Sequence, residues 1–189
     1  MPDICASVGG VQRAVQAAGW RRIGIDGVNG AGKSCLGAEL SEALGYPLLE
    51  VDDYLHQNQG GFVDFIDYPA LAAALASMPA FILCGTCLRQ VLSNLGTELD
   101  GHIYVMRMRG GLWADEDECV FPDGVDAAID NLTSAVAMVS RQLDEPTEYP
   151  DTERDEDSLR LGLEVMHYHA EYVPHEAADL AYERDEEGG

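Results

Sequence analysis

The residues with the clearest chemical pattern lie between Gly27 and Ser34, in the stretch GVNGAGKS. Two glycines with four residues between them, followed by lysine and serine, let the backbone turn so that successive N–H groups point inward at a phosphate. A lysine at this position reaches the terminal phosphates of a nucleoside triphosphate, and the serine hydroxyl ligates Mg²⁺. Lys33 is the only lysine of the chain, and a phosphate loop requires its compact ammonium group rather than the broad fork of an arginine. The pattern therefore predicts that the chain binds ATP with Mg²⁺.

The residues on either side supply the elements that a phosphate loop needs. A short branched apolar run over 21–26 predicts a strand before the loop, and helical spacing over 33–44 predicts a helix after it. The N-terminus of that helix adds its positive end to the N–H groups of the loop. We expect nucleotide contacts from Gly27, Asn29, Gly30, Ala31, Gly32, Lys33, Ser34 and Cys35.

Strand and helix patterns alternate over most of the remaining chain. This alternation predicts parallel strands joined by right-handed crossovers, hence an α/β fold, a three-layer sandwich with helices on both faces of the sheet. We expect one domain over residues 1–189. One further strand is expected to end near residue 52, and others to cover 80–84, 102–108 and 178–184. The expected helices cover 3–18, a short segment before Pro79, 86–95, 125–143 and 158–173.

Composition limits the partners that the chain can have. The sequence has 34 acidic and 11 basic residues, and its net charge of −23 repels nucleic acid and anionic membranes over most of the surface. An anionic ligand must therefore be held locally. Five cysteines, an odd number, and the lack of a basic, apolar leader favour the reducing cytoplasm. The sequence leaves the formation of a homo-oligomer open.

Two aspartates form a second chemical feature, near the end of the strand expected after the first helix. Ligands of open α/β sheets bind beyond the carboxyl ends of the strands, which is where Asp52 and Asp53 are expected. A carboxylate at Asp52 can take or orient the proton of an acceptor hydroxyl. Asp53 is interpreted either as a magnesium ligand or as a solvated turn residue.

Four stretches together resemble the uridine kinase and phosphoribulokinase group of P-loop kinases, which includes bacterial pantothenate kinase. They are IGIDGVNGAGKS, VDDYL at 51–55, IDYP at 66–69 and YHAEYVPHEAADLAY at 168–182. The resemblance implies the fold of P-loop containing nucleoside triphosphate hydrolases and transfer of a phosphoryl group from ATP. It places the catalytic base on Asp52 and the acceptor contacts on Tyr54 and Asp67. Asp67, which precedes an aromatic residue and a proline, is equally well interpreted as a helix cap.

The sequence departs from that group in two places. Cys84 stands where the group has a glutamate, which puts an auxiliary magnesium contact in question. The region of the group's basic lid is here DEPTEYPDTERDED, residues 144–157, which we expect to be a mobile, lid-like segment. Arg154 is the only basic residue within it, so we expect Arg154 to contact the transferring phosphoryl group, with Arg141 and Arg160 as the other candidates.

These observations favour a kinase that phosphorylates a hydroxyl of a neutral, nucleoside-like or other alcohol acceptor. A heavily charged acceptor would require a second basic pocket, for which the chain has few residues. The alternative is a regulatory or degenerate nucleotide-binding protein that has kept the loop without efficient transfer. Cys84 and the acidic segment are the features that favour this alternative.

Overall fold

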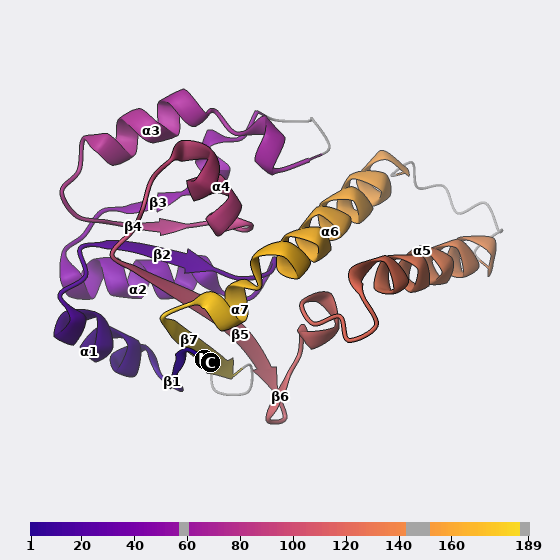
Figure 1. Cartoon of the computed structure of the whole chain (residues 1–189), viewed down its shortest axis with the longest axis horizontal. Coiled ribbons are helices and arrows are strands. Elements are labelled where there is room, and N and C mark those ends of the chain that lie inside the picture. Colours follow the sequence, from indigo (N-terminus) through magenta and orange to yellow (C-terminus); the bar gives the residue numbers. More distant parts are fainter. Residues whose placement is uncertain (57–60, 143–151, 186–189) are drawn as a thin grey trace.

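A largely parallel sheet forms the centre of the molecule (Figure 1). The computed structural model describes residues 1–56, 61–142 and 152–185, with the backbone alone over 135–142 and 152–158. Within these residues the strand order is β1–β7–β5–β2–β4–β3, and every neighbouring pair in it is parallel. The strands are β1 (Asp3–Cys5), β2 (Arg22–Asp26), β3 (Leu48–Glu50), β4 (Phe81–Cys84), β5 (Gly101–Arg109), β7 (Leu180–Asp185) and β6 (Leu112–Trp113), which pairs with β5 antiparallel.

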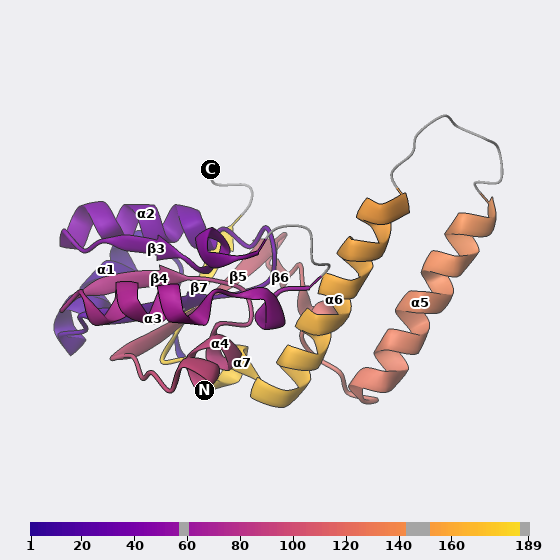
Figure 2. The ribbon, with the colours of Figure 1, turned by 90° about the horizontal axis from the view of Figure 1, so that it is seen from above.

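Helices cover both faces of the sheet (Figure 2). The chain moves in one direction across the sheet from β1 through β2 to β3, and right-handed crossovers therefore place α1 (Val8–Ala18) and α2 (Lys33–Leu44) on the same face. It returns from β3 through β4 and β5 to β7, which places α3 (Tyr68–Ala76), α4 (Leu88–Leu95) and α7 (Pro174–Ala177) on the other. The predicted α/β three-layer sandwich is confirmed.

Strands β2 and β4 run through the core. Ile23 and Ile25 of β2 and Ile82 and Leu83 of β4 are fully buried, since helices pack on both faces of these strands. As expected, a short helix precedes Pro79 and a buried strand follows it. This core holds the carboxyl ends of β2 and β3, and the loops that follow them, at the same edge of the sheet.

The N-terminal segment differs from the prediction of one helix over 3–18. Residues Asp3–Cys5 form a strand that pairs with β7 at the edge of the sheet, and the helix begins only at Val8. Ser7 explains the break, because its backbone is extended and its hydroxyl accepts a hydrogen bond from the Gly10 N–H at 3.2 Å. The spacing of apolar residues in this segment gave no sign that its first residues would pair with β7.

Two long helices, α5 (Val125–Gln142) and α6 (Thr152–Tyr172), project from the sheet as an arm (Figures 1 and 2). Of the predicted mobile segment, residues 144–151 lie outside the described part, and residues 152–157 form the first turns of α6. The mobility of this segment stays a prediction.

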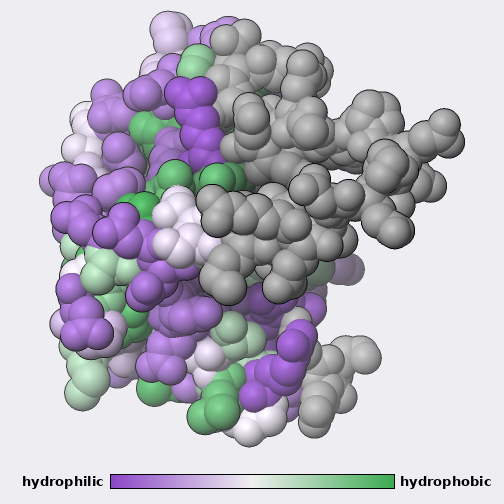
Figure 3. Space-filling view, turned by 90° about the vertical axis from the view of Figure 1, so that its right-hand side faces the viewer, coloured by the Kyte–Doolittle hydropathy of each residue, from purple (hydrophilic) through white to green (hydrophobic). Residues whose placement is uncertain are grey.

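Seen from the arm, the described surface is largely hydrophilic, with hydrophobic residues in small separate groups (Figure 3). In the part of the chain that is described, no helix combines the length and the apolarity needed to cross a membrane.

Candidate active site

The phosphate loop joins β2 to α2, as the sequence predicted. Gly27 and Gly32 have φ values of +152° and +101°, which residues with a side chain rarely adopt. A Cβ atom on Gly27 would also lie 2.9 Å from the carbonyl oxygen of Val105 on the neighbouring strand. The two glycines of the motif are therefore required by the backbone of the loop.

Lys33 lies over its own loop. Its Nζ donates hydrogen bonds to the carbonyl oxygens of Gly27 at 3.0 Å and of Val28 at 2.8 Å. Burial lowers the pKa of this ammonium group, while the negative charges of Asp26 and Asp52 oppose the shift. A phosphate oxygen is a stronger, charge-assisted acceptor than these two carbonyls, so the ammonium group is available for a nucleotide.

A cavity of about 370 Å³ opens at the loop. It brings most of the predicted nucleotide-binding residues together with Asp52, and it adds two side chains, Glu50 and Arg184, that the sequence analysis did not select. Its described lining consists of Asn29, Gly30, Gly32, Lys33, Ser34, Cys35, Glu50, Asp52, Gly85 and Arg184. The remaining predicted residues, Gly27, Ala31, Asp53, Tyr54 and Asp67, lie outside this lining.

Glu50 is the last residue of β3, and it lines the cavity together with Ser34. Burial raises the pKa of Glu50, and the charge of Asp52 contributes in the same direction. The Ser34 hydroxyl and the Glu50 and Asp52 carboxylates are hard oxygen donors of the kind that Mg²⁺ takes, together with phosphate oxygens and water. The donor set therefore fits Mg²⁺. The sequence signal for Glu50 was its place at the end of the strand, two residues before Asp52.

Asp53, Tyr54 and Asp67 occupy the loop region beyond β3. Asp53 is exposed in the 3₁₀ turn Val51–Tyr54, which matches its interpretation as a turn residue. The Asp67 carboxylate caps α3 and accepts a hydrogen bond from the Ala70 N–H at 3.0 Å. The Asp67 N–H donates to the carbonyl oxygen of Tyr54 at 2.8 Å, so these two predicted acceptor-binding residues are neighbours.

Cys84 is fully buried at the end of β4, and burial raises the pKa of its thiol. Its Sγ donates to the carbonyl oxygen of Lys33 at 3.6 Å and lies against Gly37, where a Cβ atom would come within 2.6 Å of the sulfur. A glutamate at position 84 would put a longer, charged side chain into this close contact. In this chain the carboxylate next to Ser34 comes instead from Glu50, on the neighbouring strand β3.

Arg184 comes from β7 and contacts the other side of the loop. Its Nη1 donates to the carbonyl oxygen of Ala31 at 3.3 Å. Of the arginines expected to act at the lid, Arg160 is exposed on α6, and the side chains of Arg141 and Arg154 lie outside the described part. The sequence analysis missed Arg184 because nothing in the last apolar run indicates that its end reaches the phosphate loop.

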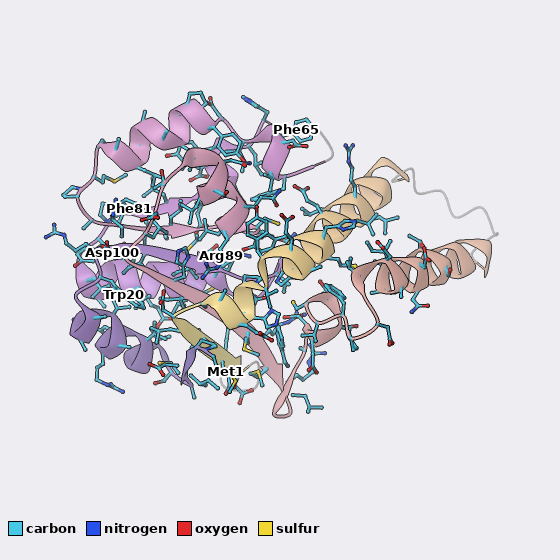
Figure 4. The ribbon with its side chains drawn as sticks, in the orientation of Figure 1. Met1, Trp20, Phe65, Phe81, Arg89 and Asp100 are labelled. Atoms are coloured by element: carbon cyan, nitrogen blue, oxygen red, sulfur yellow. The ribbon has the colours of Figure 1, made fainter. Side chains whose placement is uncertain are left out.

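The arm is anchored directly beneath the loop. Asp26, the last residue of β2, is buried and accepts hydrogen bonds from the Gly27 N–H at 2.7 Å and from the Tyr168 hydroxyl of α6. Burial raises the pKa of Asp26 to about 6, although both hydrogen bonds act in the opposite direction. The Tyr168 oxygen also accepts from the N–H of Arg89, which lies where α4, α6 and α7 meet (Figure 4).

The same helix also holds the loop that precedes α3. The Glu164 carboxylate, one turn before Tyr168, accepts hydrogen bonds from the N–H groups of Phe62 at 2.9 Å and of Val63 at 2.8 Å. These residues precede the IDYP stretch, and Phe65 stands at its edge (Figure 4). The helix α6 therefore contacts both the strand that carries the phosphate loop and the loop that carries Asp67.

At the base of the arm His169 is buried between α6 and β5. Its Nδ1 donates to the carbonyl oxygen of Val165 at 2.8 Å, so its Nε2 accepts from the Tyr104 hydroxyl at 2.7 Å. Burial lowers the pKa of His169 to about 4. With this pKa the imidazole is neutral near pH 7, so its single proton lies on Nδ1 and its Nε2 is an acceptor.

Part of the chain is similar to a known kinase family. A family model described as shikimate kinase matches residues 29–66, which run from the phosphate loop through β3 to the start of the IDYP stretch. A search of the curated proteins found no matching relative. The family match names a P-loop kinase family and does not single out the uridine kinase and phosphoribulokinase group that the sequence analysis named.

Three solved structures are similar over most of the chain. A shikimate kinase from Aquifex aeolicus is 12% identical, with 86% of both chains covered and a TM-score of 0.37. A putative kinase from Chloroflexus aurantiacus is 15% identical, with 87% of this chain and 88% of that chain covered and a TM-score of 0.38. A gluconokinase from Sinorhizobium meliloti is 16% identical, with 83% of this chain and 97% of that chain covered and a TM-score of 0.33.

Proposed function

We propose that the chain is an ATP-dependent kinase that transfers the γ-phosphoryl group to a hydroxyl of a small molecule. One observation carries the proposal. A single cavity contains Lys33 and Ser34 of the phosphate loop together with the carboxylates of Glu50 and Asp52, at the end of β3. Phosphoryl transfer requires positioning of donor and acceptor and neutralisation of charge more than covalent chemistry by the protein. This cavity has groups for each of these tasks.

The roles follow from the position of each group. The N–H groups of the loop and the N-terminus of α2 bind the phosphates, and Lys33 exchanges its two carbonyl partners for phosphate oxygens. Ser34 and Glu50 hold Mg²⁺, with Asp52 or Asp53 as a further oxygen donor near it. When bound, Mg²⁺ neutralises charge on the phosphates. Asp52 accepts the proton of the acceptor hydroxyl.

The acceptor side consists of the loop from Asp52 to Asp67, with Tyr54 and Asp67 as the acceptor-binding residues. We propose a neutral alcohol, nucleoside-like or other, as acceptor, because Lys33 and Arg184 are the basic residues of the described lining and both lie at the phosphate loop. Arg154, on α6, is the residue proposed to reach the phosphoryl group when the arm approaches the cavity.

The second candidate is a nucleotide-binding protein without efficient transfer, which the buried Cys84 in place of a glutamate favours. Formation of ADP from MgATP separates the two. We expect ADP to form faster when one member of a panel is present, with uridine, ribose and glycerol as neutral alcohols and shikimate and gluconate as anionic ones. Binding of ATP with no effect of any alcohol would favour the second candidate, and stimulation by the anionic alcohols alone would contradict a neutral acceptor.

A further inference from the structure

Arg184 reaches the phosphate loop from a distant part of the sequence. Parallel pairing of β7 with β5 places it opposite Arg107, three residues beyond the pair formed by Tyr104 and Ala181. Tyr104 in turn pairs with Asp26, the last residue before the loop. The register therefore carries Arg184 past the end of β2, to the edge of the sheet where the loop lies.

The side chain of Arg184 lies against Gly32, the second glycine of the motif. A Cβ atom at Gly32 would be 2.7 Å from Cδ and 2.9 Å from Nε of Arg184. The guanidinium group continues to the carbonyl oxygen of Ala31, to which Nη1 donates at 3.3 Å. The lack of a side chain at Gly32 therefore gives the arginine the room to lie across the loop and to line the cavity.

The charges of the cavity give this contact a function. Its described lining has two carboxylates, Glu50 and Asp52, and two cations, Lys33 and Arg184. Without Arg184 the lining would have a net negative charge, in a chain whose net charge is already −23. A nucleoside triphosphate brings several further negative charges, so a second cation at the loop directly favours its binding.

We propose that Arg184 is a donor-binding residue whose guanidinium group contacts the phosphates of the bound nucleotide. The proposal rests on the proposed function, because it takes the cavity to be the ATP site. One Nη1 bond to a carbonyl oxygen leaves the other N–H groups of the fork as donors, and a guanidinium fork matches two phosphate oxygens. Arg184 thus provides, from the last strand, positive charge at the phosphates that does not depend on movement of the arm.

Calorimetric titration with MgATP, and separately with inorganic tripolyphosphate, tests the proposal on Arg184→Gln and Arg184→Lys. We expect Arg184→Gln to weaken the binding of both ligands by about 10- to 100-fold and to reduce the dependence of affinity on salt. Arg184→Lys, which keeps the charge and loses the fork, should lie between Arg184→Gln and the wild type. Arg13→Gln removes the same charge from an exposed position on α1 and should bind as the wild type does.

Each other outcome has a definite meaning. Wild-type affinity of Arg184→Gln for both ligands overturns the proposal. A loss confined to MgATP, with tripolyphosphate unaffected, shows that Arg184 contacts the base or the ribose, which also overturns it. Equal weakening in Arg184→Gln and Arg184→Lys without any change in salt dependence assigns a structural role to the residue. A wild-type protein that binds neither ligand overturns the proposed function, and this proposal with it.

Discussion

The proposed donor side and the proposed acceptor side of the site are built in different ways. The donor side is built mainly from one continuous stretch, Asp26 to Ser34, whose shape depends on its glycines and on bonds within the stretch. Tyr168 and Arg184 contact this stretch from distant parts of the sequence. The acceptor side is a loop held by Glu164, which is 102 positions away from Phe62 in the sequence. The difference implies that a change at Glu164 of α6 affects the acceptor loop more than the phosphate loop, and the predictions below test this.

The donor side depends most on Lys33. We expect Lys33→Ala to abolish binding of MgATP, because the loop loses the compact cation among its neutral backbone donors. Stability should stay near that of the wild type, since the lysine bonds only to carbonyl oxygens of its own loop. Calorimetry measures the affinity, and thermal unfolding measures the stability. Unchanged affinity would remove the phosphate-loop assignment.

Asp52 lies between the two sides, and its substitution separates binding from transfer. Asp52→Asn keeps the shape of the side chain and removes the proton acceptor, so turnover should fall by about 10²- to 10⁴-fold while MgATP still binds. Steady-state kinetics and calorimetry on the same preparation measure the two effects. Turnover at the wild-type rate would exclude Asp52 as the base and would make Asp53 the next candidate.

Glu164 tests the acceptor side alone. Glu164→Ala leaves the buried N–H groups of Phe62 and Val63 without their acceptor, which should lower the free energy of unfolding by about 1–3 kcal/mol. We also expect KM for the acceptor to rise while the affinity for MgATP is kept. Glu171→Ala, an exposed position on the same helix, is the control. A parallel loss of MgATP affinity would show that the two sides are not separable in this way.

The pH dependence of stability should differ between Asp26, at the end of the strand beneath the phosphate loop, and His169, at the base of the arm. The pKa of Asp26 is raised from 3.8 to about 6, so in this range the folded carboxyl keeps a proton that the unfolded one releases. Its contribution to stability therefore decreases as pH rises. The pKa of His169 is lowered from 6.5 to about 4, so in that range the unfolded imidazole binds a proton that the folded one does not. Its contribution increases as pH rises.

Replacement of His169 should therefore remove the contribution to stability that increases with pH and leave that of Asp26, which decreases with pH. We expect His169→Gln to make the slope of Tm against pH less positive between about pH 4.5 and 6, because the amide does not titrate and its oxygen still accepts from Tyr104. Thermal unfolding across this range measures the effect. An unchanged slope would mean that folding does not lower the pKa of His169.

The sequence predicted those parts of the site that depend on residues close together in the chain. The glycine pattern determines the backbone of the phosphate loop, and alternation of apolar runs predicts the parallel sheet that places Asp52 beside it. The N-terminal strand was missed, because the spacing of apolar residues over 3–18 fits a helix and the pairing with β7 has no local signal.

The residues that the sequence did not reveal act across long separations. Arg184 depends on the register of β7 against β5, and Glu164 and Tyr168 depend on how α6 packs against the sheet. In a chain with 34 acidic residues, a single glutamate carries no sign of such a role. Glu50 was closest to being found, since it ends the strand that directly precedes Asp52.

The most direct test of the account is transfer of label from [γ-³²P]ATP, in the presence of Mg²⁺, to the alcohol that stimulates ADP formation. The account predicts that the label appears on a hydroxyl of that alcohol with the wild-type protein, and that Lys33→Ala gives none. Label that appears only as inorganic phosphate, or that stays in ATP with every alcohol of the panel although ATP binds, would contradict a kinase.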